Sequence, residues 1–178
     1  MALPISEGYE LHGDEIESPD IRALTEITCS VTGIDNDIAS YYKEHSRAGD
    51  TLNLVDVIAH ERGVDPRQAI PEALDMRDAQ VALFLQLSEK VRPTLSPAGH
   101  KYLAGLSAWI RGNLDWSMHT GRYRRGDRST VTVTETARRA LPTGIIPPAG
   151  ISWWWSRLNA HGTTVSVHPP IRSTAAAA

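Results

Sequence analysis

Three pairs of a capping residue and a proline punctuate the first two thirds of the sequence, and each stands before a long stretch with helical periodicity. The pairs are Ser18-Pro19, Asp65-Pro66 and Ser96-Pro97. Ser and Asp cap helix N-termini, and Pro is favoured at the first helical position, where its missing N–H costs no intrahelical hydrogen bond. The pairs therefore predict long helices over about 19–47, 66–92 and 97–120, in which apolar residues recur at spacings of three and four.

A shorter helix is predicted between the first two. Asp50 is placed to open it and Gly63 to end it, with the last helical residue near Glu61. Its apolar face would consist of Leu52, Val55, Ile58 and Ala59. Gly33 in the first long helix and Pro71 in the second turn of the third helix are candidate kinks. The fold class predicted from these four helices is all-α.

The sequence changes character at about residue 124. Residues 130–134 alternate as a short strand would, but no partner strand is evident. Five of the 11 prolines follow, together with three consecutive tryptophans at 153–155, and no helical or strand period is present. We therefore expect an N-terminal loop segment at 1–17, a helical domain at 18–123 and an irregular, poorly structured tail at 124–178. In that tail the three tryptophans would be exposed, an unusual surface liability.

Composition excludes several classes of protein. The chain has 178 residues, 41% hydrophobic and 22% charged, which suits one globular domain. The single cysteine, Cys29, allows neither an internal disulfide nor a multi-cysteine zinc site. No run of 18 apolar residues and no signal peptide is present, so we expect a cytoplasmic protein without a membrane span. Six of the eight arginines after residue 120 lie between 122 and 139 without interleaved aromatic residues beyond Tyr123, which argues against a nucleic-acid partner.

One motif in the first long helix carries chemistry. Asn36, Ser40 and Glu44 are spaced four residues apart. Each step of four advances about 40° around a helix and about 6 Å along it, so the three side chains project from one side. They offer oxygen ligands suited to Mg²⁺, which takes part of its shell from substrate phosphate, and Lys43 adds a compact positive charge. Taken alone, however, the same spacing also occurs on ordinary solvated helix faces, and the residues leave that alternative open.

The stretch NDIASYYKE at 36–44 resembles the second metal-binding motif of class I terpene synthases, (Asn/Asp)-Asp-x-x-(Ser/Thr)-x-x-x-Glu, which often carries Lys before the Glu. GYEL at 8–11 and GDTLNLVDVI at 49–58 are similar to the bacterial members as well. Near the end of the last long helix, WIRGNLDWSMHTGRY at 109–123 closes with the Arg-Tyr pair that shuts the bacterial family's pocket. The resemblance covers roughly residues 5 to 124.

The resemblance implies a role for each motif residue. One Mg²⁺, bridging to a prenyl diphosphate, would be bound by Asn36, Ser40 and Glu44. Hydrogen bonds to the diphosphate would come from Lys43, Arg122 and Tyr123. Trp116 would line the pocket and stabilise a carbocation through its electron-rich face, by about 2 kcal/mol or more once desolvated. For Trp109 we expect plain core packing instead. The reaction implied is metal-assisted ionisation of a prenyl diphosphate, farnesyl diphosphate being the expected substrate, followed by cyclisation to a terpene hydrocarbon or alcohol.

The sequence also departs from the family. The aspartate-rich motif that class I terpene synthases carry on an earlier helix does not occur, and the nearest acidic cluster, Asp14-Glu15-x-Glu17, lies in a segment flanked by Gly and Pro. The chain thus resembles the C-terminal half of a terpene synthase, a partial class I helical bundle. Its partner would be a missing N-terminal half or another copy of itself. We expect little or no cyclase activity from the isolated chain, because one metal motif holds the diphosphate from one side.

The alternative is a non-catalytic helical fragment or interaction module of terpene-synthase ancestry, which docks through exposed apolar faces without any need for Mg²⁺. The prenyl chain length, the product, the role of residues 141–178 and the oligomeric state do not follow from the sequence.

Overall fold

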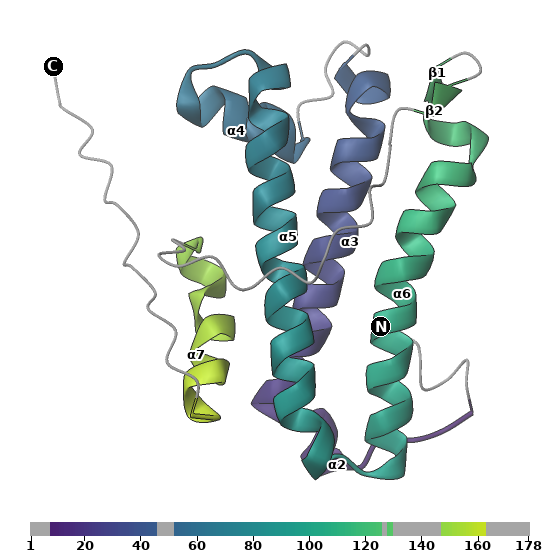
Figure 1. Cartoon of the computed structure of the whole chain (residues 1–178), viewed down its shortest axis with the longest axis vertical. Helices are drawn as coiled ribbons and strands as arrows, with labels where there is room; N and C mark the ends of the chain where they lie inside the picture. Colours follow the sequence, from purple (N-terminus) through teal and green to yellow (C-terminus); the bar gives the residue numbers. More distant parts are fainter. Residues whose placement is uncertain (1–7, 46–51, 126–127, 130–146, 163–178) are drawn as a thin grey trace, which may run out of the picture.

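The computed structural model describes residues 8–45, 52–125, 128–129 and 147–162. Three long helices lie side by side, with α3 (Pro19–His45) in contact with both α5 (Pro66–Val91) and α6 (Pro97–His119) (Figure 1). The only strands among the described residues are β1 (Arg124–Arg125) and β2 (Arg128–Ser129), which pair antiparallel with Arg124 opposite Ser129. The all-α class is confirmed. The alternating stretch 130–134 lies outside the described residues.

The three cap–proline pairs begin the three long helices as predicted. Ser18 Oγ accepts from the Asp20 amide at 3.3 Å, and Ser96 Oγ accepts from the Gly99 amide at 3.0 Å. Asp65 forms a capping box with Gln68. Helix α3 continues through Gly33, and α5 continues through Pro71. Neither candidate kink interrupts its helix.

The short helix predicted between the first two long helices begins later than expected. Helix α4 spans Leu54–Arg62, and its N-cap is Asn53, whose Oδ1 accepts from the Val55 amide at 3.0 Å. Leu52 is therefore not on its apolar face and is 92% exposed, while Asp50 lies outside the described residues. Gly63 ends the helix as predicted, at φ 65°, a left-handed conformation that favours glycine.

Two apolar cores hold the helices together. The larger core joins α3, α5 and α6 to the last described helix, α7 (Ser152–Ala160). Its largest fully buried members are Ile21, Leu24, Ile27, Leu83, Phe84, Leu87, Leu103, Leu106, Trp155 and Leu158. The smaller core ties the C-terminal end of α3 to α4 and to the first turns of α5. It consists of Tyr41, Val55, Ile58, Ala59, Ala69 and Ala73. The metal motif lies at the α3 end that the smaller core supports.

Residues 147–162 correct the expectation that 124–178 is irregular throughout. A 3-10 turn at Ala149–Ile151 leads into α7, which packs against α3 and α5 (Figure 1). Trp154 and Trp155 are buried rather than exposed, and the Trp154 Nε1–H donates to Glu26 Oε2 at 2.8 Å. Arg157 Nε lies 2.7 Å from Asp20 Oδ1. A helix of nine residues spans too few turns to show a period, and its tertiary partners stabilise it.

The expected N-terminal loop also contains structure. A single helical turn, α2 (Gly13–Ile16), places Glu15 over the N-terminus of α6. Glu15 Oε1 accepts from the Ser96 amide at 2.9 Å, and Oε2 accepts from the Ser96 hydroxyl at 2.6 Å. A further 3-10 turn at Arg92–Thr94 joins α5 to α6. No helix in the described part of the chain combines the length and apolarity needed to cross a membrane.

Candidate functional site

The three predicted metal ligands lie on one unbroken helix. Because α3 runs from Pro19 to His45 without a break, Asn36, Ser40 and Glu44 occupy successive turns of a single face. Ser40 is only 1% exposed, whereas Asn36 and Glu44 are half-buried. Lys43, the expected phosphate donor, is also half-buried, in the turn that carries Glu44. The motif therefore forms a partly covered polar strip at the C-terminal end of α3.

The Ser40 hydroxyl is a buried polar group that the described residues leave unpartnered. In a helix, serine and threonine hydroxyls usually bond to the carbonyl four residues earlier, as Thr28 does to Leu24 at 2.8 Å. A buried hydroxyl without a partner costs about 1–3 kcal/mol. A cation coordinated by the Ser40 oxygen would remove that penalty, so this position fits a metal ligand.

Tyr123 brings the far end of the chain against the motif. After α6, a 3-10 turn at Gly121–Tyr123 buries the tyrosine ring, and its hydroxyl accepts from Asn36 Nδ2 at 2.7 Å. The rings of Trp116 and Tyr123 meet edge to face, 5.8 Å apart. Arg122 is exposed, with its guanidinium carbon 5.7 Å from the Tyr123 ring centre. Four of the predicted site residues thus lie together, although more than 70 positions separate the first from the others in the sequence. They are Asn36, Trp116, Arg122 and Tyr123.

Two contacts between the motif and the start of α4 were not predicted from the sequence. Asn53, the N-cap of α4, donates through Nδ2 to Glu44 Oε2 at 3.0 Å. Asp37 Oδ2 accepts from the Leu54 amide at 2.9 Å. The hydrogen bonds described above use the nitrogen of Asn36 and one oxygen of Glu44. Within the described residues, the amide oxygen of Asn36 and the second oxygen of Glu44 are therefore left for a cation.

Negative charge collects around the motif. Burial raises the pKa of Asp37, the amide of Leu54 lowers it, and the charge of Glu44 raises it further, with a net upward shift. Burial likewise raises the pKa of Asp35, although Arg77 Nε lies 2.9 Å from Asp35 Oδ1 and opposes the shift. Asp35 is paired with Arg77, whereas Asp37 and Glu44 repel each other, and a divalent cation bound at Glu44 would relieve that repulsion.

Trp109 is not a core residue, contrary to the sequence prediction. Trp109 is 45% exposed and Trp116 is 50% exposed, and both line a shallow groove of 320 Å³ with Gly112 and Asn113. The two tryptophans are seven residues apart, which is two helical turns, so they share one face of α6. The buried face of α6 belongs to other residues. These are Tyr102, Leu103, Leu106, Ile110 and Ser117. Trp109 therefore joins Trp116 on the aromatic side of the site.

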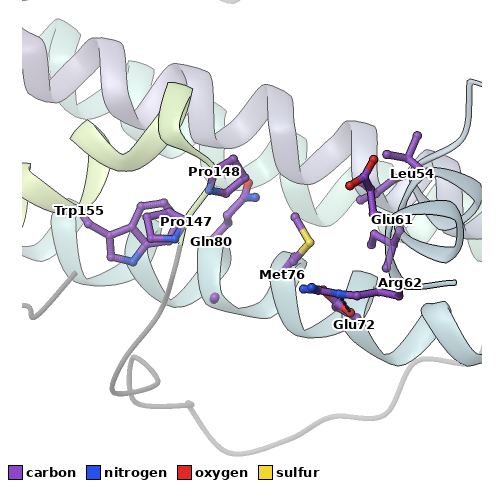
Figure 2. A pocket seen from close by; sticks show the side chains of 12 residues that line it. Leu54, Glu61, Arg62, Glu72, Met76, Gln80, Pro147, Pro148 and Trp155 are labelled. Atoms are coloured by element: carbon purple, nitrogen blue, oxygen red, sulfur yellow. Dashed lines mark hydrogen bonds and ion pairs between the residues drawn. The ribbon is translucent and has the colours of Figure 1, made fainter. Parts of the chain in front are cut away.

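A larger cavity of 550 Å³ lies between α4, α5 and residues 147–155. Figure 2 shows Trp155 with Pro147 and Pro148 at one end, and Arg62 with Glu72 at the other. Those two charged groups pair with each other, at 2.7 Å between Nη2 and Oε1. None of the predicted site residues lines this cavity, and the one arginine among its lining residues, Arg62, is paired with Glu72. The polar strip of α3 with the aromatic face of α6 is therefore the better candidate site.

Comparison with known proteins identifies the sequence pattern. Residues 2–82 match a family model described as terpene synthase family 2, C-terminal metal binding. A (+)-T-muurolol synthase, farnesyl diphosphate cyclizing, from Streptomyces clavuligerus is 35% identical over 165 residues, which cover 86% of this chain and 38% of that protein. The chain spans less than half of the length of the curated relatives that it matches.

Solved structures agree with the sequence matches. The SVS_A2 protein, obtained by ancestral sequence reconstruction, aligns with a TM-score of 0.71 at 31% identity, over 89% of this chain and 43% of its own. A 2-methylisoborneol synthase from Streptomyces coelicolor, solved with Mg²⁺ and geranyl-S-thiolodiphosphate, aligns with a TM-score of 0.62 at 32% identity, over 67% of this chain and 38% of its own. The similarity thus extends from sequence to three-dimensional arrangement.

Proposed function

Because the chain belongs to the class I terpene synthase family and spans the C-terminal part of its members, we propose that it binds Mg²⁺ and the diphosphate of a prenyl diphosphate. Asn36, Ser40 and Glu44 would hold the metal. Lys43, Arg122 and Tyr123 would donate hydrogen bonds to the diphosphate oxygens. The reaction would be ionisation of the substrate and cyclisation to a terpene hydrocarbon or alcohol.

The observation that carries this proposal is the buried, unpartnered hydroxyl of Ser40, flanked one turn away on each side by Asn36 and Glu44. An ordinary solvated helix face would place this hydroxyl in water. The Ser88 and Ser117 hydroxyls are also buried and unpartnered, but of these three serines Ser40 is the one that lies between Asn36 and Glu44. A relative solved with Mg²⁺ and a diphosphate analogue at 32% identity supports the choice of metal. The farnesyl diphosphate cyclizing relative supports a 15-carbon substrate.

The residues of this chain have separable tasks in the proposed mechanism. Mg²⁺, when bound, supplies positive charge that favours departure of the diphosphate. The Arg122 guanidinium, permanently charged and planar, holds the leaving diphosphate as the carbon–oxygen bond breaks and the bonding electrons stay on oxygen. Trp116 and Trp109 line the groove of α6, and their electron-rich faces would stabilise the resulting allylic cation, by about 2 kcal/mol each where water is excluded. Loss of a proton or capture of water would end the reaction.

Water exclusion is the limiting requirement. Both tryptophans are about half exposed, and their groove is shallow in the described part of the chain. A carbocation needs a dry pocket. We therefore propose that this chain alone binds metal and diphosphate but cyclises little, and that a further segment or subunit must cover the aromatic face.

The exposure of Trp109 and Trp116 also favours a second candidate, a non-catalytic helical interaction module that docks through this aromatic face. The two functions differ in metal dependence. Partner binding through the tryptophans would need neither Mg²⁺ nor diphosphate.

The deciding experiment is calorimetric titration of inorganic diphosphate into the chain, with and without Mg²⁺. We expect Mg²⁺-dependent binding that Ser40→Ala weakens at least tenfold and Glu44→Ala abolishes. Ser88→Ala is the matched control, because the Ser88 hydroxyl is also buried and unpartnered but lies on α5, away from the motif. Equal weakening by both serine substitutions, or binding that ignores Mg²⁺, would contradict the metal site.

A further inference from the structure

We propose that Asn53 is the positioning residue for Glu44, so that the first turn of α4 sets the geometry of the third metal ligand. This inference rests on the proposed function, because it assigns a role within the same site. Asn53 does not belong to the nine-residue motif, and it reaches Glu44 only through the fold.

The Asn53 side chain is buried and takes part in three hydrogen bonds. Asn53 is 2% exposed, and its Nδ2 donates both to Glu44 Oε2 at 3.0 Å and to the Asp37 carbonyl at 2.9 Å. Its Oδ1 accepts from the Val55 amide at 3.0 Å. Both hydrogens of the amide nitrogen and one lone pair of the oxygen are therefore used.

These contacts fix which end of the amide meets Glu44. If the amide were turned over, its oxygen would face the carboxylate of Glu44 and the carbonyl of Asp37, and its NH₂ would face the Val55 amide. Three hydrogen bonds would become three repulsions. Asparagine is therefore required for donation at this position, whereas capping alone would be satisfied by Ser, Thr or Asp.

A second contact locks the same two helices. The Leu54 amide, the first of α4, donates to Asp37 Oδ2 at 2.9 Å. Asn53 and Leu54 thus form hydrogen bonds to α3 at Asp37 and at Glu44, which are seven residues or about two turns apart. The start of α4 can shift only if the hydrogen bonds to Asp37 and to Glu44 both break. A glutamate has three rotatable side-chain bonds, and this clamp holds Glu44 in one rotamer, with its second oxygen left for the cation.

The chemistry of the clamp matches what metal ligands need. A neutral N–H donor orients a carboxylate without competing for the cation by charge. Removal of such an outer partner typically weakens metal binding by about 10- to 100-fold. Asn53 itself would not touch the metal or the substrate, so its effect is confined to the placement of Glu44.

Two substitutions separate the donor from the cap. Asn53→Ser keeps a capping oxygen but removes the amide that reaches Glu44, and Asn53→Ala removes both. Asp65→Ser is the matched control, because it makes the corresponding cap change at α5, on the exposed N-terminus of a helix outside the motif. Each full-length chain is titrated with inorganic diphosphate in the presence of Mg²⁺, and its thermal unfolding midpoint is measured in parallel.

We expect Asn53→Ser and Asn53→Ala to weaken Mg²⁺-dependent diphosphate binding alike, by about 10- to 100-fold, with Asp65→Ser unchanged. Asn53→Ser should lower the unfolding midpoint more than Asp65→Ser does, because it removes two hydrogen bonds of a buried side chain, so binding is compared at a temperature at which every variant is folded. Full binding by Asn53→Ser, with loss confined to Asn53→Ala, would mean that only the cap matters and would overturn the positioning role. Absence of Mg²⁺-dependent binding in the unsubstituted chain would instead overturn the proposed function, and this inference with it.

Discussion

Tyr123→Phe removes a single oxygen atom and tests whether the turn after α6 is fastened to the metal motif. The ring is buried, so phenylalanine fills the same space and keeps the edge-to-face contact with Trp116. The substitution deletes the acceptor for Asn36 Nδ2, which now lies 2.7 Å from the hydroxyl. The substitution therefore removes the hydroxyl and its hydrogen bond to Asn36 while the ring keeps its packing.

The structure sets the magnitude. A typical intramolecular hydrogen bond contributes about 0.5–1.5 kcal/mol net, and a buried donor left unpaired costs about 1–3 kcal/mol. Asn36 is only half-buried, so water can reach its amide and the loss should lie toward the lower range. We expect a decrease of about 1 kcal/mol in the free energy of unfolding, roughly a fivefold change in the folding equilibrium.

The assay is a double-mutant cycle in urea with Tyr123→Phe, Asn36→Ala and both together. A coupling energy near 1 kcal/mol is expected, and a value below about 0.3 kcal/mol, within the usual error of additivity, would refute the reasoning. Tyr102→Phe is the matched control, because its hydroxyl also bonds to a side chain of α3, Thr25, at 2.9 Å, but far from the metal motif. Both phenylalanine variants should lose similar stability, but only Tyr123→Phe should weaken Mg²⁺-dependent diphosphate binding.

Two further predictions concern the supports of the fold. A Cβ at Gly99 would overlap the carboxylate of Glu15, so Gly99→Ala should lower the unfolding midpoint in urea, and Glu15→Ala in the same chain should recover part of the loss. Burial would raise the pKa of Asp20, but hydrogen bonds and charges from Arg157 and His161 outweigh it, and the net shift is downward from 3.8. A carboxyl whose pKa is lower in the folded state than in the unfolded state stabilises the protein at a pH above its unfolded-state pKa. That stabilisation is lost as the pH falls through the folded-state pKa. The unsubstituted chain should therefore have a higher free energy of unfolding than Asp20→Asn above about pH 5, and this difference should decrease below about pH 4. Urea unfolding of both chains at successive pH values measures it.

The long helices could be predicted because their signals are local. A capping side chain and a proline act within one turn, and they placed the starts of α3, α5 and α6 correctly. The spacing of Asn36, Ser40 and Glu44 was likewise enough to put them on one face, since helical geometry alone decides it. Most of what lay within a single element followed from the sequence, but the start of α4 was predicted at Asp50 and its N-cap is Asn53.

What depended on contacts between elements did not follow. Trp109 was expected in the core because it lies near the stripe that includes Tyr102 and Leu106, but α6 has only one covered side and Trp109 falls beyond its edge. Trp154 and Trp155 gave no period because their helix has nine residues, and the acidic groups that receive it, Asp20 and Glu26, lie more than 120 positions earlier. Asn53 carried a local signal, since asparagine favours N-caps, but its link to Glu44 appears only once α4 folds back on α3.

The two cores support different ends of α3, and the metal motif lies at the end that the smaller core supports. The N-terminal half of α3 is buried in the larger core, where leucines, isoleucines and tryptophans supply most of the apolar area. The motif lies beyond it, beside a core of six residues of which three are alanines. Alanine buries little surface, and the larger side chains that pack against this core are only partly buried, namely Ile38, Leu54, Ile70 and Met76. The polar contacts there, Asn53 with Glu44 and Leu54 with Asp37, must supply much of its order. Because a ligand stabilises the state that binds it, we expect a bound cation to stabilise the motif end of α3.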